Sequence, residues 1–242
     1  MTTIIIFFLA HWYLSLFGQT FFYHRYGAHS MFTMSRTWEK FFFIFSWLTQ
    51  GSSYLNPRAY GIMHRMHHAY SDTAKDPHSP HFFENIFTMM WGTKKIYHAL
   101  LKGTYRVEEK FEKNLPVWPA LERMADSWYS RLAFAFVYII FYGIFATEWW
   151  LFFLLPFHFL IGPVHGAIVN WGGHKYGYRN WKEKDHSTNT LPVDFLMGGE
   201  LFQNNHHHAS NRANFANKWW EIDPSYPIIL FLNKIGVIRL RI

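Results

Sequence analysis

Long apolar stretches alternate with shorter polar segments along this chain, and the apolar stretches are candidates for membrane helices. Residues 1–23 contain no Asp, Glu, Lys or Arg. As a helix they would extend ~34 Å, enough to cross the ~30 Å hydrocarbon core of a bilayer. A cleavable signal peptide would need a charged start and a small-residue cleavage site, and neither is present. The pattern therefore predicts a retained transmembrane helix.

The next apolar stretch, residues 41–55, is too short to cross a bilayer. It would extend only ~22 Å as a helix, and it includes the polar residues Gln50, Ser52 and Ser53. A crossing here would also put the histidines before it and those after it on opposite faces of the membrane. We therefore expect an interfacial or re-entrant helix. A soluble cap is expected to follow over residues 69–131, which hold most of the polar material.

The last long apolar segment, residues 132–173, divides naturally into two runs. Glu148 is its single charged residue, and it lies between the two runs. We expect two membrane helices joined by a tight turn there, which returns the chain to the side that it left. Arg and Lys residues gather on the face of the membrane that holds the histidines. By the positive-inside rule, this face is expected to be the cytoplasmic one.

These segments together predict an all-α integral membrane protein that forms a single domain over residues 1–242. It would have three transmembrane helices, an interfacial helix and a cytoplasmic helical cap, with the N-terminus outside. Aromatic residues make up 21% of the chain and charged residues only 16%, which differs from an ordinary soluble surface and fits aromatic side chains anchored at a membrane interface.

Charge and cysteine content narrow the possible partners and ligands. The formal net charge is +7, but the sequence has no stripe of basic residues interleaved with aromatic residues that could stack on bases. An anionic lipid headgroup or substrate is therefore expected rather than nucleic acid. The chain has no Cys, which excludes disulfides and thiolate metal sites. Any metal must therefore be held by nitrogen and oxygen ligands.

The histidines gather in a few short segments at or just beyond the ends of the predicted helices. His64, His67 and His68 fall at i, i+3 and i+4, so a helix would direct their imidazoles at one small volume. His24 and His29 lie about 140° apart round an ideal helix, so both reach one site only if the helix ends or distorts at Gly27. The complete set of expected metal ligands is His24, His29, His64, His67, His68, His174, His206 and His207.

Eight imidazoles are more than one metal ion can use, so we expect a His-rich site for two metals with positions left open. His206 and His207 are about 100° apart on a helix and are suited to serve different metals. An imidazole set suits iron, copper or zinc. Zinc has no redox chemistry, so a redox metal is the more useful hypothesis for a membrane enzyme that meets long acyl chains.

The motifs resemble those of the membrane fatty acyl desaturases of the stearoyl-CoA desaturase type. The HxxxxH box matches residues 24–29, the HxxHH box residues 64–68 and the NxxxH element residues 170–174. Residues 72–80, 199–207 and 219–224 resemble further signatures, so the resemblance covers nearly the whole chain.

This resemblance implies a diiron centre that uses O2 to introduce a cis double bond into a long acyl chain. The substrate would be an acyl-CoA by default, with an acyl-lipid also possible. Two electrons would come from a separate donor, such as a ferredoxin or a cytochrome b5-like protein with its reductase.

Three features depart from the family pattern. Gln203 occupies the first position of the third box, where the family usually has His, and Asn170 is the family's water-mediated position. The amide oxygen of either residue is a possible ligand or a partner of a bound water. Ile62 and Met63 replace polar residues expected in the acyl-CoA branch, which leaves an acyl-lipid or acyl-carrier substrate open. The chain also has one predicted crossing fewer than the family's usual four.

Other polar residues have plainer explanations. The histidines expected to be structural or solvated rather than ligating are His11, His78, His81, His98, His158, His165 and His208. Lys94 and Lys95 follow Trp91 and are candidates to hold an anionic headgroup, although adjacent lysines near a membrane usually serve as lipid-facing anchors.

Two other functions remain open. A membrane hydroxylase would use a similar site, although the related hydroxylases place their first two boxes closer together than His24 and His64; an alcohol product rather than an alkene would identify one. A non-enzymatic metal-binding membrane protein would need an exchangeable site and a path for ions, whereas these ligands are spread over four segments.

Overall fold

The computed structural model of this chain describes residues 1–241 and is mostly helical. In chain order its elements are α1 (Thr2–Phe17), the π-helix η1 (Gly18–Ala28), β1 (Phe32–Met34), α2 (Arg36–Gln50), the 3-10 turn η2 (Gly51–Ser53), α3 (Pro57–Tyr70), α4 (Ile86–Leu101), α5 (Glu109–Glu112), α6 (Pro119–Ala125), α7 (Trp128–Phe145), the 3-10 helix η3 (Trp149–Leu154), α8 (Leu155–Phe159), α9 (Ile161–Ala167), the π-helix η4 (Ile168–Gly172), α10 (Gln203–His208), α11 (Ser225–Lys234) and β2 (Ile238–Leu240).

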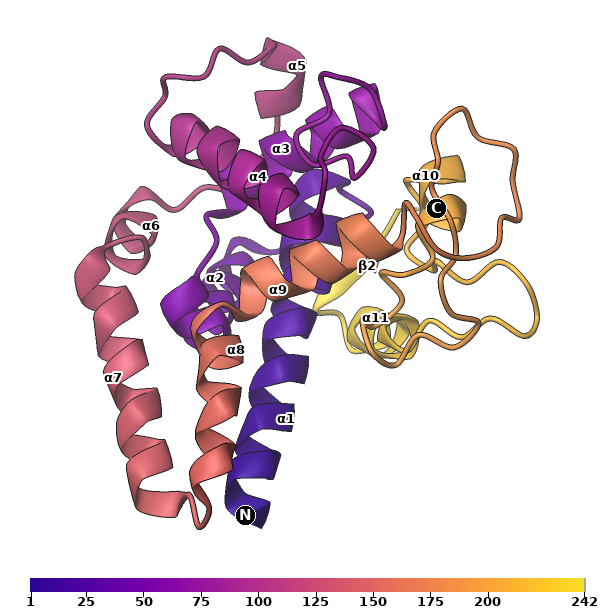
Figure 1. The fold of residues 1–242 in the computed structure, drawn as a ribbon. Helices are drawn as coiled ribbons and strands as arrows, with labels where there is room; N and C mark the ends of the chain where they lie inside the picture. The colour runs from indigo at the N-terminus through magenta and orange to yellow at the C-terminus, as the bar shows by residue number, and fades with distance from the viewer. Residues whose placement is uncertain (242) are drawn as a thin grey trace.

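Helices α1, α7 and α8 lie side by side and form the elongated lower part of the molecule (Figure 1). Thr2–Ala28 and Trp128–Phe145 are each long and apolar enough to cross a membrane. The Met1 amine donates a hydrogen bond to Thr147 Oγ1 at 2.9 Å, so the start of α1 and the α7–η3 turn lie at the same end. Apolar helices of this length fit a membrane protein.

Buried polar residues join these three helices inside the apolar layer. The Nδ1 atoms of His11 in α1 and His158 in α8 are 2.6 Å apart, and the Tyr142 hydroxyl of α7 lies 2.9 Å from His158 Nε2. Satisfying polar groups against one another is what a medium without water requires. The expectation that His11 and His158 pack as polar groups is therefore confirmed.

The second helix of the predicted hairpin differs from the expectation of one straight crossing. Trp149–Phe159 and Ile161–Gly172 meet at an angle of 75°. The Ser53 hydroxyl accepts a hydrogen bond from the Gly162 N–H at 3.0 Å, which satisfies a backbone group that the bend exposes. By length and composition, two helices of the described chain qualify as membrane spans, or three if the bent pair counts as one. The predicted count of three is thus the upper figure.

Helix α2 agrees with the prediction of a helix that does not cross, although it begins and ends about five residues before the predicted stretch. The Ser35 hydroxyl caps its start by accepting from the Trp38 N–H at 3.3 Å. Its end is at Gly51, which has φ +51. With a length of 15 residues, α2 reaches only ~22 Å.

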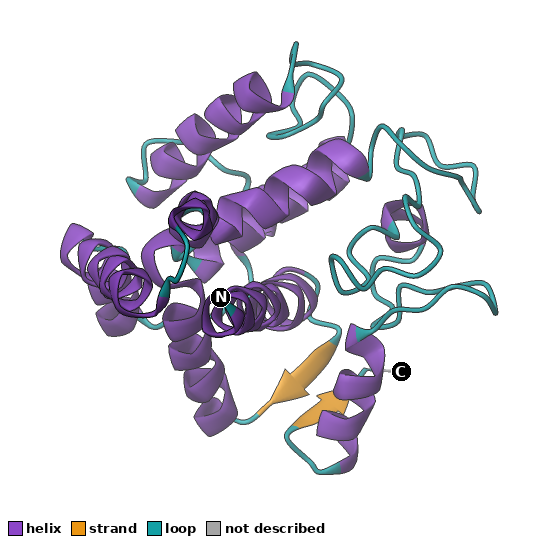
Figure 2. Cartoon of the chain, turned by 60° about the horizontal axis from the view of Figure 1, so that its bottom comes forward, coloured by secondary structure: helices purple, strands orange, loops and turns teal. Residues whose placement is uncertain are grey.

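Two short strands depart from the all-α prediction. β1 and β2 pair antiparallel, with Phe32 opposite Leu240 and Met34 opposite Ile238. Figure 2 shows this ribbon beside α11, next to the end of the long first helix. Phe32 and Ile238 are buried in one core together with Phe21 of η1. The strands therefore fix the C-terminal segment against the helix that carries the first histidine box.

The segment expected to be a soluble cap is helical but not uniformly polar. It contains α4, α5 and α6, and α4 begins at a capping box formed by Asn85 and Thr88. Phe87 and Trp91 of α4 are 82% and 57% exposed. Because large apolar side chains of a water-facing cap would be covered, this face of α4 fits contact with lipid better than contact with water.

Candidate metal centre

A π-helix places the first pair of predicted ligands. η1 continues α1 with i→i+5 hydrogen bonds, and the last of them runs from the His29 N–H to the His24 carbonyl at 3.1 Å. The wider turn brings residues five apart to neighbouring positions, and the two imidazole centroids are 5.0 Å apart. The distortion that the spacing required is therefore present, but it begins at Gly18 rather than at Gly27.

Helix α3 carries the next three imidazoles and is tied to the end of η1. The Asn56 side chain caps its start by accepting from the Ala59 N–H at 3.0 Å. The Arg65 guanidinium donates to the carbonyls of Ala28 and Gly27 at 2.7 and 3.1 Å. These bonds hold the HxxHH segment beside the HxxxxH segment.

The imidazoles gather in two adjacent clusters. The ligand nitrogens of the five-histidine cluster, and separately those of the three-histidine cluster, all lie within 4.8 Å of one another. The five-histidine cluster is His24, His29, His64, His68 and His206, and the three-histidine cluster is His67, His174 and His207. All eight predicted ligands are thus brought together, and the neighbours His206 and His207 belong to different clusters.

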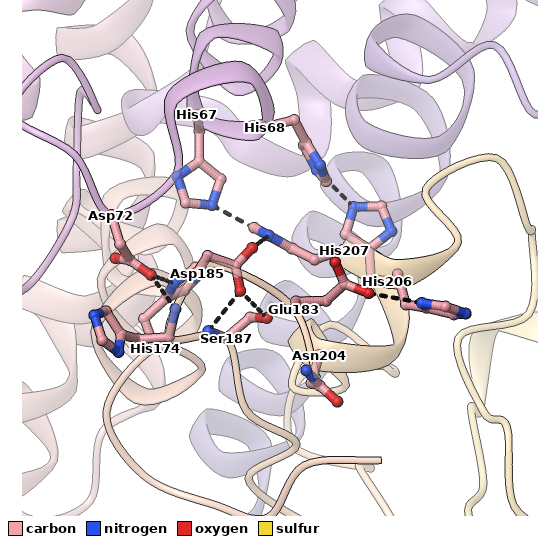
Figure 3. A network of polar contacts seen from close by, with 12 residues as sticks. His67, His68, Asp72, His174, Glu183, Asp185, Ser187, Asn204, His206 and His207 are labelled. Carbon is pink, nitrogen blue, oxygen red and sulfur yellow. Dashed lines mark hydrogen bonds and ion pairs between the residues drawn. The ribbon is translucent and has the colours of Figure 1, made fainter. Parts of the chain in front are cut away.

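The Nε2 atoms face one another in pairs across the centre. His68 Nε2 lies 2.9 Å from that of His206, and His67 Nε2 lies 3.2 Å from that of His207 (Figure 3). The first and second boxes also meet, since His29 Nε2 and His64 Nε2 are 2.7 Å apart. Segments from both ends of the chain therefore converge on one volume.

Aspartates hold the outer nitrogen of each imidazole in the three-histidine cluster, and Figure 3 shows two of them, Asp72 and Asp185. The distances from Nδ1 to the carboxylates are 2.9 Å for His67 and Asp76, 2.8 Å for His174 and Asp72, and 2.6 Å for His207 and Asp185. Such contacts fix the ring orientation and leave Nε2 free to bind a metal.

In the five-histidine cluster, Glu200 plays the corresponding part for His24. Its carboxylate lies 2.6 Å from His24 Nδ1. The fully buried Arg25 pairs with Glu200 at 3.1 Å and with Asp223 at 2.8 Å, and its guanidinium lies 3.8 Å from the centre of the Phe215 ring. This network holds Glu200 in place.

None of these four carboxylates has a role predicted from the sequence. Asp72 and Asp76 follow the HxxHH box and Glu200 precedes the third box, so a search for acids next to the boxes would have found them. Asp185 lies in the irregular segment between η4 and α10. No spacing rule connects it with His207.

Burial and the carboxylates act in opposite directions on the imidazoles. Burial, reinforced by neighbouring imidazoles, holds the pKa values of His29, His64, His68 and His206 well below the usual range. Burial also lowers the pKa of His67, but the negative charges of Asp76, Asp72 and Asp185 outweigh it and raise the pKa. Most of the site is thus held in the neutral form that binds metal ions.

Gln203 lies on α10 and points its amide nitrogen at backbone. Its Nε2 donates to the Glu200 carbonyl at 2.6 Å, and its side chain packs so closely on Gly173 that an added Cβ there would lie 2.4 Å from Gln203 Cγ. Asn170 and Gln203 line the same cavity. Their expected contact with a metal or with a bound water stays a prediction.

The remaining histidines of these segments have other partners. The His208 Nδ1 lies 2.7 Å from Glu183 and its ring stacks on Trp181, so it faces away from the clusters as predicted. His81 Nε2 contacts the His174 carbonyl at 3.0 Å. His78 is buried and forms a group with Asp76 and His67, which agrees with the expectation of a turn residue beside the ligands.

A largely apolar cavity of about 870 Å³ reaches the five-histidine cluster. Its lining includes His64 from the five-histidine cluster and Lys94 and Trp91 from α4. The volume is in the range of pockets that enclose a small-molecule ligand. Lys94 lies 4.7 Å from the Trp91 ring, and Lys95 borders a shallower hollow beside the cavity. Lys94 therefore has direct access to the cavity and Lys95 lies next to it.

Known proteins that resemble this chain match it over most of its length. Residues 1–221 match the fatty acid desaturase family. The chain is 31% identical to an acyl-CoA C20 Delta5-desaturase of Anemone leveillei, covering 92% of this chain and 68% of that protein. It is 30% identical to a hex-5-enoyl-[acyl-carrier protein] acetylenase of Moorena producens (strain JHB), covering 94% and 73%. It is 27% identical to an sn-1 stearoyl-lipid 9-desaturase of Anabaena variabilis, covering 95% and 80%. The chain belongs to the fatty acid desaturase family and is an acyl desaturase, an oxidoreductase.

Proposed function

We propose that this protein is an oxygen-dependent desaturase that introduces a cis double bond into a long acyl chain at a diiron centre. The observation that carries the proposal is the division of eight imidazoles into two adjacent clusters, together with a largely apolar cavity whose lining includes His64. The ligands would be the members of the five-histidine and three-histidine clusters. Asn170 and Gln203 would contact the centre directly or through water.

The donor atoms fit a pair of metal ions. Each of His67 and His207 has its Nδ1 against a carboxylate, so the Nε2 atoms of the two rings are directed at each other, 3.2 Å apart. This separation is close to that of two nitrogens that share one metal at ~2.1 Å. Within the described chain the buried His174 Nε2 has no hydrogen-bond partner, as expected of a metal-binding atom.

When bound, two iron ions would supply the O2 chemistry. In the overall reaction two adjacent CH2 groups each lose one hydrogen atom, and O2, two electrons and two protons complete the formation of two waters. An acyl chain in the cavity would lie next to the centre, because the cavity wall includes the proposed ligand His64. Its apolar lining excludes bulk water from the reacting carbons.

The relatives named above act, by their names, on acyl-CoA, acyl-carrier protein and acyl-lipid substrates. An anionic group on any of these carriers would meet Lys94 at the cavity and Lys95 beside it. We take acyl-CoA as the default substrate and acyl-lipid as the alternative.

The active site would lie on the cytoplasmic face of an integral membrane protein, where an external donor delivers electrons. A ferredoxin or a cytochrome b5-like protein with its reductase would serve. All the predicted ligands lie at the end of the molecule opposite the Met1–Thr147 contact, which supports one face for the whole centre.

Expression in a host that lacks unsaturated fatty acids tests the function. We expect new cis alkenes, located by mass spectrometry of the double-bond position, and about two irons per chain. His67→Ala removes a proposed ligand and should abolish desaturation while the protein stays in the membrane, because metal affinity depends on every ligand. An alcohol product would instead identify a hydroxylase, and full activity of His67→Ala or of a zinc-only preparation would refute the diiron centre.

A further inference from the structure

The two clusters are unequal in ligand number. Among the described residues, one contains five imidazoles and the other three. Both would hold the same kind of metal ion, so the smaller cluster leaves more of its coordination positions to other groups.

The geometry of two helices points to Gln203. In α3, His64 and His68 at i and i+4 belong to the five-histidine cluster, whereas His67 at i+3 belongs to the three-histidine cluster. In α10, Gln203, His206 and His207 repeat the same spacing. Since residues at i and i+4 share a helix face, Gln203 shares a face with His207, which is a member of the three-histidine cluster.

A second contact places Gln203 beside that cluster independently. Its Cγ packs on Gly173, the residue that precedes His174. Its amide nitrogen is used by the Glu200 carbonyl at 2.6 Å, so only the amide oxygen remains to face a metal or a bound water. An amide oxygen is a weaker ligand for iron than an imidazole nitrogen.

The aspartates compensate in part for the missing imidazole. Each ligand of the three-histidine cluster has its own aspartate, at 2.6 to 2.9 Å. In the five-histidine cluster, Glu200 is the carboxylate in contact with a ligand among the described residues, and its charge is shared with Arg25. The smaller cluster thus has fewer nitrogen donors but more negative charge around them.

We propose that the two metals are held unequally. The three-histidine cluster, one imidazole short at Gln203, is the labile site, and it retains its metal through Asp72, Asp76 and Asp185. The five-histidine cluster retains its metal through ligand number. This inference rests on the proposed diiron centre.

Metal loss from purified, iron-loaded protein in excess chelator tests the inference, with iron content followed by mass spectrometry. We expect two phases in the unchanged protein, in which about one equivalent leaves at least ~10-fold faster than the other. Loss of an outer partner of a ligand costs about 10–100-fold in metal affinity, so loss of a direct ligand should cost no less. Gln203→His should slow the fast phase by ~10-fold or more, and Asp185→Asn should accelerate it.

His208→Ala is the matched control. It removes an imidazole that is also paired with a carboxylate and is adjacent to His207, but it lies outside both clusters, so both phases should keep their rates. Loss of both irons in a single phase overturns the inference, as does a fast phase that Gln203→His and Asp185→Asn leave unchanged. If Gln203→His does not fold, the unchanged protein and Asp185→Asn still decide. Iron content before chelation is a separate measure, and a value far below two refutes the diiron centre itself.

Discussion

Each imidazole of the three-histidine cluster acts together with a carboxylate that comes from another part of the chain. The His207 and Asp185 pair shows the principle, because their atoms lie 2.6 Å apart although 22 residues separate them. A ring held from both sides loses little further entropy when a metal binds. The proposed ligands are thus held in place before a metal binds.

The third histidine box gives the prediction at this scale. We expect His208→Ala to keep most of the desaturase activity, since the His208 ring stacks on Trp181 and faces away from the clusters. Gln203→Ala should lose much of the activity through weaker iron retention, and Gln203→His should be tolerated. Product yield per membrane-inserted protein measures all three. An inactive His208→Ala with a normal Gln203→Ala would mean that His207 and His208 are the last two ligands.

Spacing within the boxes and the predicted return of the chain to one face of the membrane together placed the eight histidines at one site, because helix periodicity fixes which side chains share a face. It also required a distortion between His24 and His29, which the π-helix supplies. Spacing could not assign Asp185, since the loop that carries it has no periodicity. Residue spacing could not predict the division into five and three imidazoles either, because this division depends on how α3 and α10 approach each other.

At the scale of elements, glycines decide how closely helices approach. Gly51 ends α2 with φ +51, and an added Cβ would lie 1.8 Å from the Tyr138 hydroxyl of α7. The contact brings η2 against a membrane helix and places Ser53 where it receives the Gly162 N–H of the bent segment.

We therefore expect Gly51→Ala to lower the thermal stability of the detergent-solubilised protein clearly. The cost combines an unfavourable backbone conformation, about 1–3 kcal/mol, with the clash against Tyr138. Gly103→Ala is the matched control: Gly103 also has positive φ, at +67, but nothing lies within 4 Å of an added Cβ. The proposed packing is wrong if both variants lose the same amount in thermal unfolding.

The bend at Leu160 shows where hydrophobic pattern stops being informative. The apolar run continues through this position, so composition predicts one helix. The hydrogen bond from Gly162 to Ser53 comes from residues 109 apart in the chain, and such a contact leaves no local signal. The short strands were missed for the same reason, since β1 gains its partner only from the far C-terminus.

At the scale of the whole molecule, the ends of α1 define two sides. One end carries the Met1 contact with Thr147, and the other carries His24 within 3.0 Å of His206. Apolar helices run between them. If the membrane surrounds these helices, the histidine clusters and the start of α1 are on opposite sides.

This arrangement predicts that tags at the C-terminus and in the 102–113 loop are cytoplasmic and that the N-terminus is outside. Arg36, which follows the Thr2–Ala28 helix, favours this orientation, whereas Arg25 lies inside that helix and is paired with Glu200 and Asp223. A protease-protection assay on intact cells and inverted vesicles measures it. Protection of both termini on the same side would mean that α2 crosses the membrane after all, or that α1 does not.

The distance along the chain between the two halves of the site has a consequence for biosynthesis. His24 and His206 are in contact although 182 residues separate them. At about 5–20 residues per second, a ribosome needs roughly 10 to 40 s to reach His206 after it has made His24. Throughout that interval α1 is already available for insertion into the bilayer, while its histidines still lack their partners from α10. Loading of the proposed diiron centre would therefore follow translation of α10, and a chain stalled before Gln203 would offer the cell an unfinished site at the membrane surface.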